Sequence, residues 1–377
     1  MLLHPAPTRV PVLDLGSMSA ELAAELDAAW HGVLTSSAFV GGPAVDTFEQ
    51  EWAAYCGRRH AVGVANGTDA IQLVLRALEI GTGDEVIVPT NTFVATVEAI
   101  LHAGATPRLV DVDPRSLVLQ AAAIEAAITQ RTAAVIAVDL HGNMPDMGAL
   151  LGVADRHGIA LVEDAAQAHG ASWRGRRAGS FGVASCFSFY PGKNLGAFGD
   201  AGAVVTDDAG LARRVRSLSN HGRTEGLSNV HERIGGNSRL DTLQAAVLSA
   251  KLRALDGWND RRRRVADAYR SQLPGSVVPI EITAGTDSAY HQFVVRVDGR
   301  DRIRAMLADR DIGTGIHYPV PCHRQPPYRA FAAGPLPVAD LAATQILSLP
   351  MFPHMTDEQI WSVCAGLEDV GTDGPLA

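Results

Sequence analysis

An α/β fold with a mainly parallel sheet is predicted by two residue patterns that alternate along this chain. Short apolar runs typical of buried strands occur at residues 61–65, 85–89, 108–112, 134–138 and 160–164. Stretches with the apolar spacing of helices lie between them, at residues 68–78, 93–102, 121–128 and 147–157. A strand, a helix and a second parallel strand form a crossover unit, so the alternation predicts a sheet with helices on both faces.

Further strands and helices are predicted after residue 164. Two further β-rich runs, 183–189 and 202–206, complete a predicted sheet of the seven-stranded type. Helical patterns follow at 240–255 and 261–271, then a β-like run at 292–297 and helices near 302–310 and 357–367. We therefore expect a large domain at residues 1–255 and a smaller α+β domain at residues 256–377.

Composition limits the class of protein. The 377 residues are 47% hydrophobic and 19% charged, which indicates a globular chain rather than a disordered one. Nowhere is there an apolar run of about 18 residues that could span a membrane, and prolines interrupt the first dozen residues where a signal segment would stand. We expect a cytoplasmic protein without a membrane partner.

Charge and cysteine spacing narrow the class further. A formal charge of −9 argues against nucleic acid as the main partner. The four cysteines are far apart and lack metal-ligand spacing, so we expect reduced structural thiols and no metal site.

Lysine usage singles out one residue. Among 32 basic side chains only Lys193 and Lys251 are lysines, which suggests a task that arginine cannot perform. A desolvated lysine amine can lose its proton and attack a carbonyl, whereas arginine stays protonated. Lys193 follows an apolar strand and is the candidate nucleophile; Lys251 lies in a helical pattern and is expected to be an exposed helix residue.

Polar residues at the predicted strand ends supply further candidates, because ligands of such sheets bind at the carboxyl ends of the strands. Asp164 closes a strand, where it is either a hydrogen-bonding cap or, with a Schiff-base lysine nearby, the carboxylate that keeps the ring nitrogen of pyridoxal phosphate protonated. Gly67 and Thr68 open a helix and offer backbone amides to a phosphate, although the same residues also suit an ordinary turn. Ser188 could add a hydroxyl, and Phe93 either stacks on a flat ring or belongs to the core.

Several motifs together resemble the DegT/DnrJ/StrS family of sugar aminotransferases. They occur in order from about residue 12 to residue 366, at residues 66–70, 83–89, 163–170, 187–194, 199–202, 236–241 and 316–319. The resemblance implies the aspartate-aminotransferase fold type (fold type I) and pyridoxal 5′-phosphate as cofactor.

The resemblance also implies roles for single residues. Lys193 matches the Schiff-base lysine, Asp164 the partner of the pyridine nitrogen, and Gln167 the side chain beside the cofactor's phenolic oxygen. Phe93 matches a ring-stacking position. The phosphate cradle matches Gly67, Thr68 and Ser188.

Two further matches concern a partner subunit and the substrate. Asn237 matches an asparagine that reaches the cofactor phosphate of a neighbouring subunit, which implies a homodimer with shared active sites. His317 and Tyr318 match positions near the sugar nucleotide. The segment 220–231 lacks aromatic residues that many relatives place in this substrate-facing loop, and Ala201 replaces the commoner glycine, so the substrate is the least constrained feature.

The expected activity is transfer of an amino group from L-glutamate to a 3-keto or 4-keto deoxysugar linked to a nucleotide, dTDP in the first instance. Two other enzyme activities stay open, amination of a cyclitol or aminobenzoate precursor and dehydration of a sugar. Relatives that dehydrate can carry histidine at the lysine position, so Lys193 disfavours dehydration. A regulator that only binds the cofactor is the non-enzyme alternative.

Overall fold

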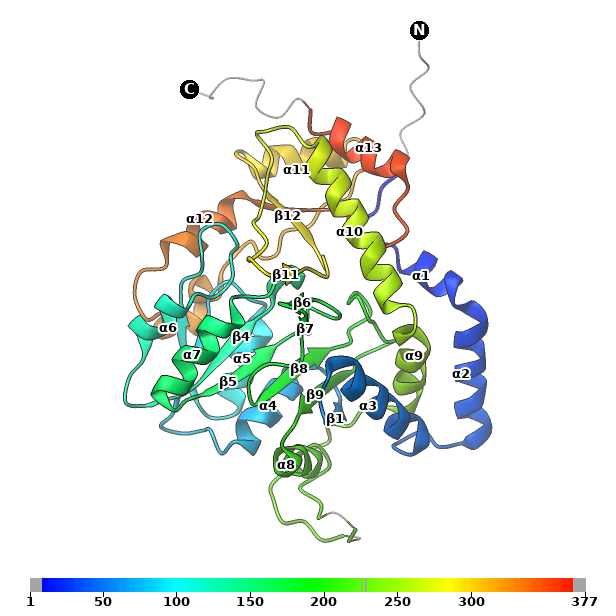
Figure 1. The fold of residues 1–377 in the computed structure, drawn as a ribbon, viewed down its shortest axis with the longest axis vertical. Coiled ribbons are helices and arrows are strands. Elements are labelled where there is room, and N and C mark those ends of the chain that lie inside the picture. Colours follow the sequence, from blue (N-terminus) through cyan, green and yellow to red (C-terminus); the bar gives the residue numbers. More distant parts are fainter. Residues whose placement is uncertain (1–8, 225, 228, 369–377) are drawn as a thin grey trace.

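The computed structural model describes residues 9–224, 226–227 and 229–368. Its large sheet has seven strands in the order β1-β9-β8-β5-β4-β2-β3 (Figure 1). These strands are β1 (His60–Val64), β2 (Glu85–Pro89), β3 (Thr106–Val110), β4 (Thr132–Val138), β5 (Ala160–Asp164), β8 (Ala184–Ser188) and β9 (Gly202–Thr206). Only β9 runs antiparallel to its neighbours, β1 and β8; the remaining pairs are parallel. The predicted α/β class and mainly parallel sheet are confirmed.

Helices cover both faces of this sheet, because successive residues of a strand point to opposite faces and both sets are apolar here. One face packs against α4 (Gly67–Ala77), α5 (Val94–His102) and α8 (Ala209–Ser219). The other face packs against α3 (Pro43–Cys56), α6 (Ala121–Ala127), α7 (Met147–His157) and α9 (Thr242–Leu252). Sequence patterns predicted α4 to α7 and α9 within three residues of their ends, but did not predict α3 and α8.

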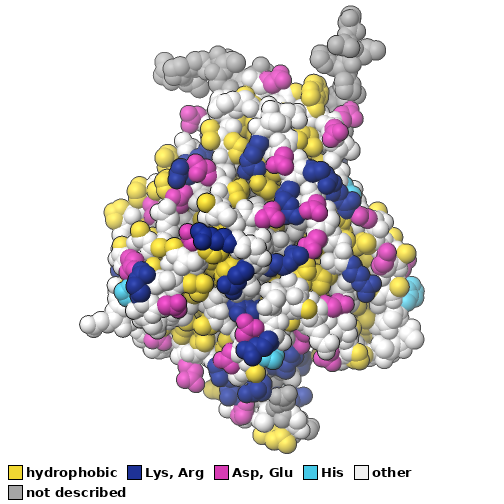
Figure 2. All heavy atoms as spheres, in the orientation of Figure 1, with side chains coloured by type: hydrophobic (Ala, Val, Ile, Leu, Met, Phe, Trp, Pro, Cys, Tyr) yellow, Lys and Arg dark blue, Asp and Glu magenta, His cyan; other side chains and the backbone are white. Residues whose placement is uncertain are grey.

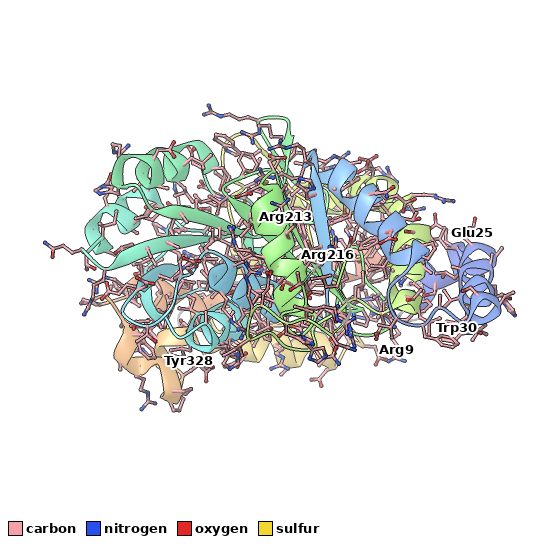
Figure 3. The ribbon with its side chains drawn as sticks, turned by 90° about the horizontal axis from the view of Figure 1, so that it is seen from below. Arg9, Glu25, Trp30, Arg213, Arg216 and Tyr328 are labelled. Carbon is pink, nitrogen blue, oxygen red and sulfur yellow. The ribbon has the colours of Figure 1, made fainter. Side chains whose placement is uncertain are left out.

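The edge strand β1 is closed by a link between the two helical layers. Arg216 of α8 lies 2.6 Å from the carboxylate of Glu49 of α3, and the same carboxylate accepts a hydrogen bond from Gly63 N at 2.7 Å. Figure 3 shows α8 lying across the sheet with Arg213 and Arg216 along it. The Glu49 carboxylate therefore occupies part of the open hydrogen-bonding edge of β1.

The remaining elements lie around this core. Before the sheet come α1 (Leu15–Glu21) and α2 (Ala23–Ser36); after it come α10 (Leu255–Gln272), α11 (Arg300–Ala308), α12 (Pro337–Gln345) and α13 (Asp357–Ala365). A three-stranded sheet is formed by β10 (Val278–Pro279), β12 (Phe293–Arg296) and β13 (Ile346–Leu349), and another by β6 (Ser172–Trp173), β7 (Arg176–Arg177) and β11 (Thr286–Asp287). Short 3₁₀ helices occupy Leu140–Gly142, Cys322–Arg324 and Pro326–Phe331.

A separate apolar cluster joins α10, α11 and α13 to β12 and β13. Val10 belongs to it and pairs with Ile312, so the start of the described chain packs against its C-terminal part. In Figure 1, α10 runs from the level of the large sheet to these C-terminal elements.

The surface mixes both signs of charge. Figure 2 shows basic and acidic side chains interspersed over the visible face. Cys56, Cys186, Cys322 and Cys364 are buried free thiols, as expected. Within the described ranges, no helix combines the length and the apolar character that a membrane crossing requires.

One expectation is wrong: Lys251 is not an exposed helix residue. Only 5% of it is accessible to solvent, and its Nζ donates to the carbonyl oxygen of Gly196 at 2.8 Å. Helical spacing identifies the helix, but the buried face depends on what packs against it. Here the segment after β8 covers the side chain.

Candidate active site

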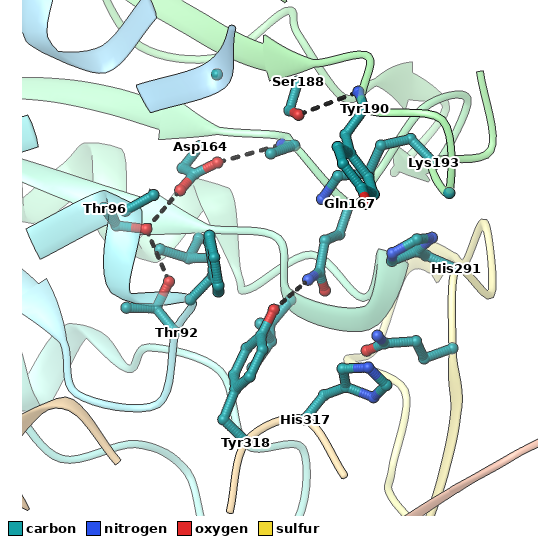
Figure 4. Close-up of a pocket in the computed structure, with 18 of the residues that line it drawn as sticks. Thr92, Thr96, Asp164, Gln167, Ser188, Tyr190, Lys193, His291, His317 and Tyr318 are labelled. Atoms are coloured by element: carbon teal, nitrogen blue, oxygen red, sulfur yellow. Dashed lines mark hydrogen bonds between the residues drawn. The ribbon is translucent and has the colours of Figure 1, made fainter. Parts of the chain in front are cut away.

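A cavity of about 450 Å³ opens at the carboxyl ends of the parallel strands (Figure 4). Its wall comes from the start of α4, the start of α5, the end of β5 and the end of β8, together with C-terminal residues near 291, 317 and 348–351. Apart from Asn237, every predicted site residue lines it: Gly67, Thr68, Phe93, Asp164, Gln167, Ser188, Lys193, His317 and Tyr318. The topology therefore gathers residues that are up to 251 positions apart, from Gly67 to Tyr318.

Lys193 lies in the segment 189–199 that follows β8, called the Lys193 loop below. Its backbone N–H donates to the carbonyl of Tyr190 at 2.8 Å, which forms a tight turn. Burial lowers the pKa of the Lys193 amine to about 8, although the nearby carboxylate of Asp164 opposes this shift. A lysine with this pKa is partly unprotonated near neutral pH, as a nucleophile or base requires.

Asp164 ends β5 and is buried. Its carboxylate accepts a hydrogen bond from the hydroxyl of Thr96 at 2.8 Å and another from Ala166 N at 3.2 Å. The hydroxyls of Thr92 and Thr96 lie 2.8 Å apart, so they extend the chain of hydrogen bonds (Figure 4). Burial raises the pKa of Asp164, against the effect of the hydrogen bond from Thr96. A cation in the cavity, such as a protonated ring nitrogen, would stabilise the ionised form.

The start of α4 can accept an anion. The side chain of Asn66 accepts from Asp69 N at 2.8 Å and caps the helix, which leaves the earlier amides of Gly67 and Thr68 facing the cavity wall. A Cβ on residue 67 would lie 2.6 Å from Cβ of Ser188, so only glycine lets the helix start approach β8 this closely. The positive end of the helix dipole and the Ser188 hydroxyl suit a phosphate.

Gln167 has a fixed amide orientation. Its Oε1 accepts from His141 N at 2.7 Å, and its Nε2 donates to the hydroxyl of Tyr318 at 3.0 Å. Phe93 is 52% exposed and therefore is not a core residue; its ring centroid lies 5.5 Å from that of Tyr318. The stacking alternative is the one that the exposure of Phe93 favours.

Two histidines, His291 and His317, line the cavity on the side opposite the strand ends. His317 Nδ1 lies 2.8 Å from the hydroxyl of Ser348, and His291 Nδ1 lies 3.1 Å from Oδ1 of Asn194, the residue next to Lys193. Burial lowers the pKa of His317 to about 4 and that of His291 well below its usual value, with the Lys193 charge adding to both shifts. Both rings are therefore neutral near pH 7.

Sequence reasoning missed His291 and Thr96. Thr96 lies one helical turn after Thr92, so the spacing of two hydroxyl residues at the start of a helix was the available signal. His291 lies two residues before β12, and nothing in its own neighbourhood indicated that the segment before this strand would lie beside Lys193.

Asn237 stands apart from the cavity. It is exposed, and its backbone pairs with Asn220 in a short antiparallel bridge. Its expected contact with a partner subunit stays a prediction.

The residues present fit pyridoxal phosphate. An amine for the aldehyde carbon, a buried carboxylate, an aromatic ring at the cavity wall and an anion-binding helix start occur in one cavity. Lys193, Asp164, Phe93 and the Gly67–Thr68 turn supply these four functions.

Comparison with known proteins agrees with this geometry. Residues 20–368 match the DegT/DnrJ/EryC1/StrS aminotransferase family. The dTDP-3-amino-3,4,6-trideoxy-alpha-D-glucose transaminase of Streptomyces venezuelae is 50% identical over 355 residues, which cover 93% of each chain. The erythromycin biosynthesis sensory transduction protein EryC1 of Saccharopolyspora erythraea is 48% identical over 364 residues, covering 95% of this chain and 99% of the relative.

Solved structures extend the likeness to the backbone. DesV of S. venezuelae in complex with a ketimine intermediate superimposes with a TM-score of 0.93 at 48% identity, covering 96% of this chain and 98% of the other. NtdA of Bacillus subtilis with its bound cofactor PMP gives a TM-score of 0.89 at 30% identity, covering 97% and 86%. Aminotransferases of this family use pyridoxal phosphate. From its fold, its cavity and its sequence, this chain belongs to the DegT/DnrJ/EryC1/StrS aminotransferase family.

Proposed function

We propose that this chain is a pyridoxal-phosphate-dependent aminotransferase that converts a nucleotide-linked keto deoxysugar into an amino sugar, with L-glutamate as the amino donor. The observation that carries the proposal is the presence of the Lys193 amine and the Asp164 carboxylate in one cavity at the strand ends. The names of the similar transaminases support a dTDP-linked sugar as the substrate and C3 of that sugar as the carbon that receives the amino group.

The cofactor supplies an aldehyde for amines and an electron-withdrawing ring. Lys193 holds the cofactor, and its freed amine then takes a proton from the α-carbon of the donor. In the second half of the cycle the same amine returns a proton to the sugar carbon that receives nitrogen. A pKa of about 8 suits both directions of proton transfer.

Other residues bind and orient. Asp164 keeps the ring nitrogen protonated, and Thr96 holds that carboxylate in place. Phe93 lies against the ring face. Gln167 has one amide N–H beyond its bond to Tyr318, and we assign it to the phenolic oxygen.

Backbone amides of Gly67 and Thr68 bind the phosphate together with the hydroxyl of Ser188. The neutral imidazole of His317 and the hydroxyl of Tyr318 face the sugar side of the cavity, where they can donate or accept hydrogen bonds without carrying charge.

The first experiment replaces Lys193 with arginine, which keeps the positive charge but cannot bond covalently to an aldehyde. Borohydride treatment of the wild-type protein loaded with pyridoxal phosphate should add the cofactor's mass to the peptide that contains Lys193, and the variant should lack both this adduct and turnover. Wild-type turnover by Lys193→Arg would show that another residue performs the chemistry.

The second experiment identifies the substrate. Protein loaded with pyridoxamine phosphate is mixed with 3-keto and 4-keto nucleotide sugars, and the return of the aldehyde-form absorbance is followed. Reaction with the 3-keto compounds supports the proposal; reaction only with cyclitol ketones, or loss of a sugar hydroxyl without amino transfer, would replace it. The name of EryC1 describes a sensory transduction protein, so a regulatory function is the alternative. A protein that binds the cofactor but reacts with no ketone would support this alternative.

A homodimer with shared sites is part of the proposal. Large exposed apolar residues follow one another from α2 into the next turn: Trp30 (42%), Leu34 (46%), Phe39 (48%) and Val40 (59%). Figure 3 shows Trp30 at the outer edge of α2. Val40 pairs with Asp241, close in sequence to Asn237, so this apolar surface continues toward the segment assigned to the partner's phosphate.

Mixed dimers test the shared site. A dimer of one Lys193→Ala chain and one Asn237→Ala chain has one site with both substitutions and one site with neither. Co-refolding the two impaired variants should therefore restore activity if Asn237 serves the partner. Recovery no greater than the sum of the separate variants would place each site within one chain.

We also propose a division of the chain near residue 255, where α10 begins, and a cytoplasmic location. An apolar cluster whose buried members, apart from Val10, all come from residues 265–367 supports the division. Four buried thiols are compatible with a reducing compartment. Limited proteolysis near residue 255 and cell fractionation test the two statements.

A further inference from the structure

The Lys193 loop is closed on itself. Ala197 N donates to the carbonyl of Phe189 at 2.8 Å, so residues 189 and 197 fasten the two ends of the turn that contains Lys193. A Cβ on Gly196 would lie 2.3 Å from the carbonyl oxygen of Pro191, which means that residue 196 packs directly on the backbone preceding Lys193. A displacement of Gly196 must therefore move the backbone that carries Lys193.

Two side chains of α9 hold the outer side of this loop. Gln244 Oε1 accepts from Phe198 N at 2.7 Å, and Lys251 Nζ donates to the carbonyl of Gly196 at 2.8 Å. Gln244 and Lys251 are seven positions apart, about two helical turns, and so project from the same face of α9. The Lys251 ammonium also lies 4.4 Å from the centroid of the Phe198 ring, within the range of a cation–π contact.

The burial of Lys251 is costly. In the described part of the chain, its ammonium contacts a carbonyl oxygen and a ring face, neither of which carries a full negative charge. Taking an ammonium out of water without a carboxylate beside it is unfavourable, and burial lowers the pKa of Lys251 to about 8. A hydrocarbon side chain at this position would pack at lower cost, so stability alone does not explain the residue.

The carbonyl of Gly196 explains why residue 251 is a lysine rather than an arginine. Gly196 presents a single carbonyl oxygen in a closed space, and a compact ammonium fits there better than a planar guanidinium with five donors. In a chain whose other basic residues are arginines, both lysines are thus attached to one loop: Lys193 within it and Lys251 beneath it.

We infer that Lys251 and Gln244 are positioning residues for Lys193: they fix residues 196–198 and thereby the place of the reacting amine. Lys251 does not line the cavity, so its influence passes through the loop. The inference rests on the proposed role of Lys193 and adds the residues that keep its amine in reach of the donor carbon.

The test uses Lys251→Met, which keeps the length of the side chain but removes the charge and the donor. Gln244→Leu removes the second contact, and Arg253→Met is the matched control because it removes an exposed cation from the C-terminal end of the same helix. Hydrogen exchange is first measured on the cofactor-free proteins. Lys251→Met and Gln244→Leu should each exchange the amides of residues 189–199 at least about tenfold faster, and Arg253→Met at the wild-type rate.

Single-turnover kinetics over a range of donor concentrations then measure the donor half-reaction of the loaded proteins; its limiting rate is written kcat and its half-saturating donor concentration KM. Misplacement of a reacting group by about 1 Å can cost up to a hundredfold in rate, so we expect kcat to fall tenfold or more in both loop-contact variants while KM changes less than about twofold. The double variant should lose less than the product of the single losses, since both contacts hold the same segment.

Two results would overturn the inference. One is wild-type exchange of residues 189–199 together with wild-type kcat in both variants. The other is faster exchange that extends equally over α9 and the core, with kcat reduced only in proportion to unfolded protein, because that pattern describes a structural role. If Lys251→Met fails to fold, Gln244→Leu carries the same test. Turnover by Lys193→Arg would refute the proposed function instead, while the exchange result would still decide whether α9 holds the loop.

Discussion

Asp139 and Glu163 form a carboxyl pair inside the protein, and their protonation can be tested directly. Both residues are fully buried. Asp139 directly follows β4, and Glu163 lies in the neighbouring strand β5. Oε2 of Glu163 accepts from Gly179 N, Phe181 N and the hydroxyl of Ser185, at 3.0, 3.2 and 2.6 Å. Burial raises the pKa of both carboxyls, and the negative charge of Glu163 raises the pKa of Asp139 further.

The raised pKa values mean that the native pair keeps a proton to a higher pH than an unfolded aspartate does, and we expect the two carboxyls to share it. In the unfolded chain an aspartate releases its proton near pH 4. Between that pH and the pH at which the native pair ionises, the native state binds one proton more than the unfolded state, so the pair's contribution to the free energy of unfolding falls by about 1.4 kcal/mol for each pH unit.

Asp139→Asn should remove this pH dependence, because an amide N–H can replace the shared proton while keeping the shape. Over the pH range in which only the native pair holds the proton, the wild type should lose about 1.4 kcal/mol per pH unit relative to the variant. With an unfolding entropy of roughly 0.8 kcal/mol/K for a chain of 377 residues, this corresponds to about 2 °C in melting temperature per pH unit.

The assay is thermal and denaturant unfolding of cofactor-free protein at pH 6, 7 and 8, with Asp155→Asn as an exposed control on α7. The control should follow the wild type at every pH. Parallel pH profiles for wild type and Asp139→Asn would refute the shared proton, and a variant that is less stable at all three values by the same amount would indicate a lost contact instead.

Three further outcomes are expected. Asp164→Asn should bind cofactor but slow the donor half-reaction at least about a hundredfold in stopped-flow absorbance, since the charge that keeps the ring nitrogen protonated is gone; an unchanged rate would contradict the electron-sink role. Gly67→Ala places a Cβ 2.6 Å from that of Ser188 and should raise the cofactor dissociation constant tenfold or more by equilibrium titration, a result that wild-type affinity would exclude. Burial lowers the pKa of His141 and of His169 to about 3, so each should contribute a loss of about 2 kcal/mol of stability on going from pH 6.5 to pH 5; denaturant midpoints of the wild type and of His141→Asn and His169→Asn measure it, and a variant whose pH profile runs parallel to that of the wild type would contradict it.

The strands and the positions of Asp164 and Lys193 were predictable because both depend on local sequence. Runs such as that of β4 are apolar on both faces, which only a covered parallel strand requires, and a strand end fixes where the next polar residue must lie. Asp164 ends one such strand and Lys193 lies five residues after the end of another, so their meeting in one cavity follows from topology.

Other features depend on contacts between distant segments. Helix α2 buries only Leu26 and Val33 among its fourteen residues, so its sequence lacks the apolar stripe that identifies a helix. Lys251 was misjudged for a related reason: α9 is covered from several sides, and nothing in its own sequence indicates that the Lys193 loop lies on it. His291 joins the cavity only because the segment before β12 packs beside that loop.

The scarcity of lysine has a chemical consequence for a protein that must meet a free aldehyde. Such a molecule condenses with accessible primary amines, and most proteins carry many of these on their surface. This chain has two lysine side chains. Lys251 is buried and its amine is hydrogen-bonded to a backbone carbonyl, whereas Lys193 lines the cavity. Surplus aldehyde therefore finds a single receptive ε-amine, and an adduct trapped on the peptide that contains Lys193 counts filled sites one for one.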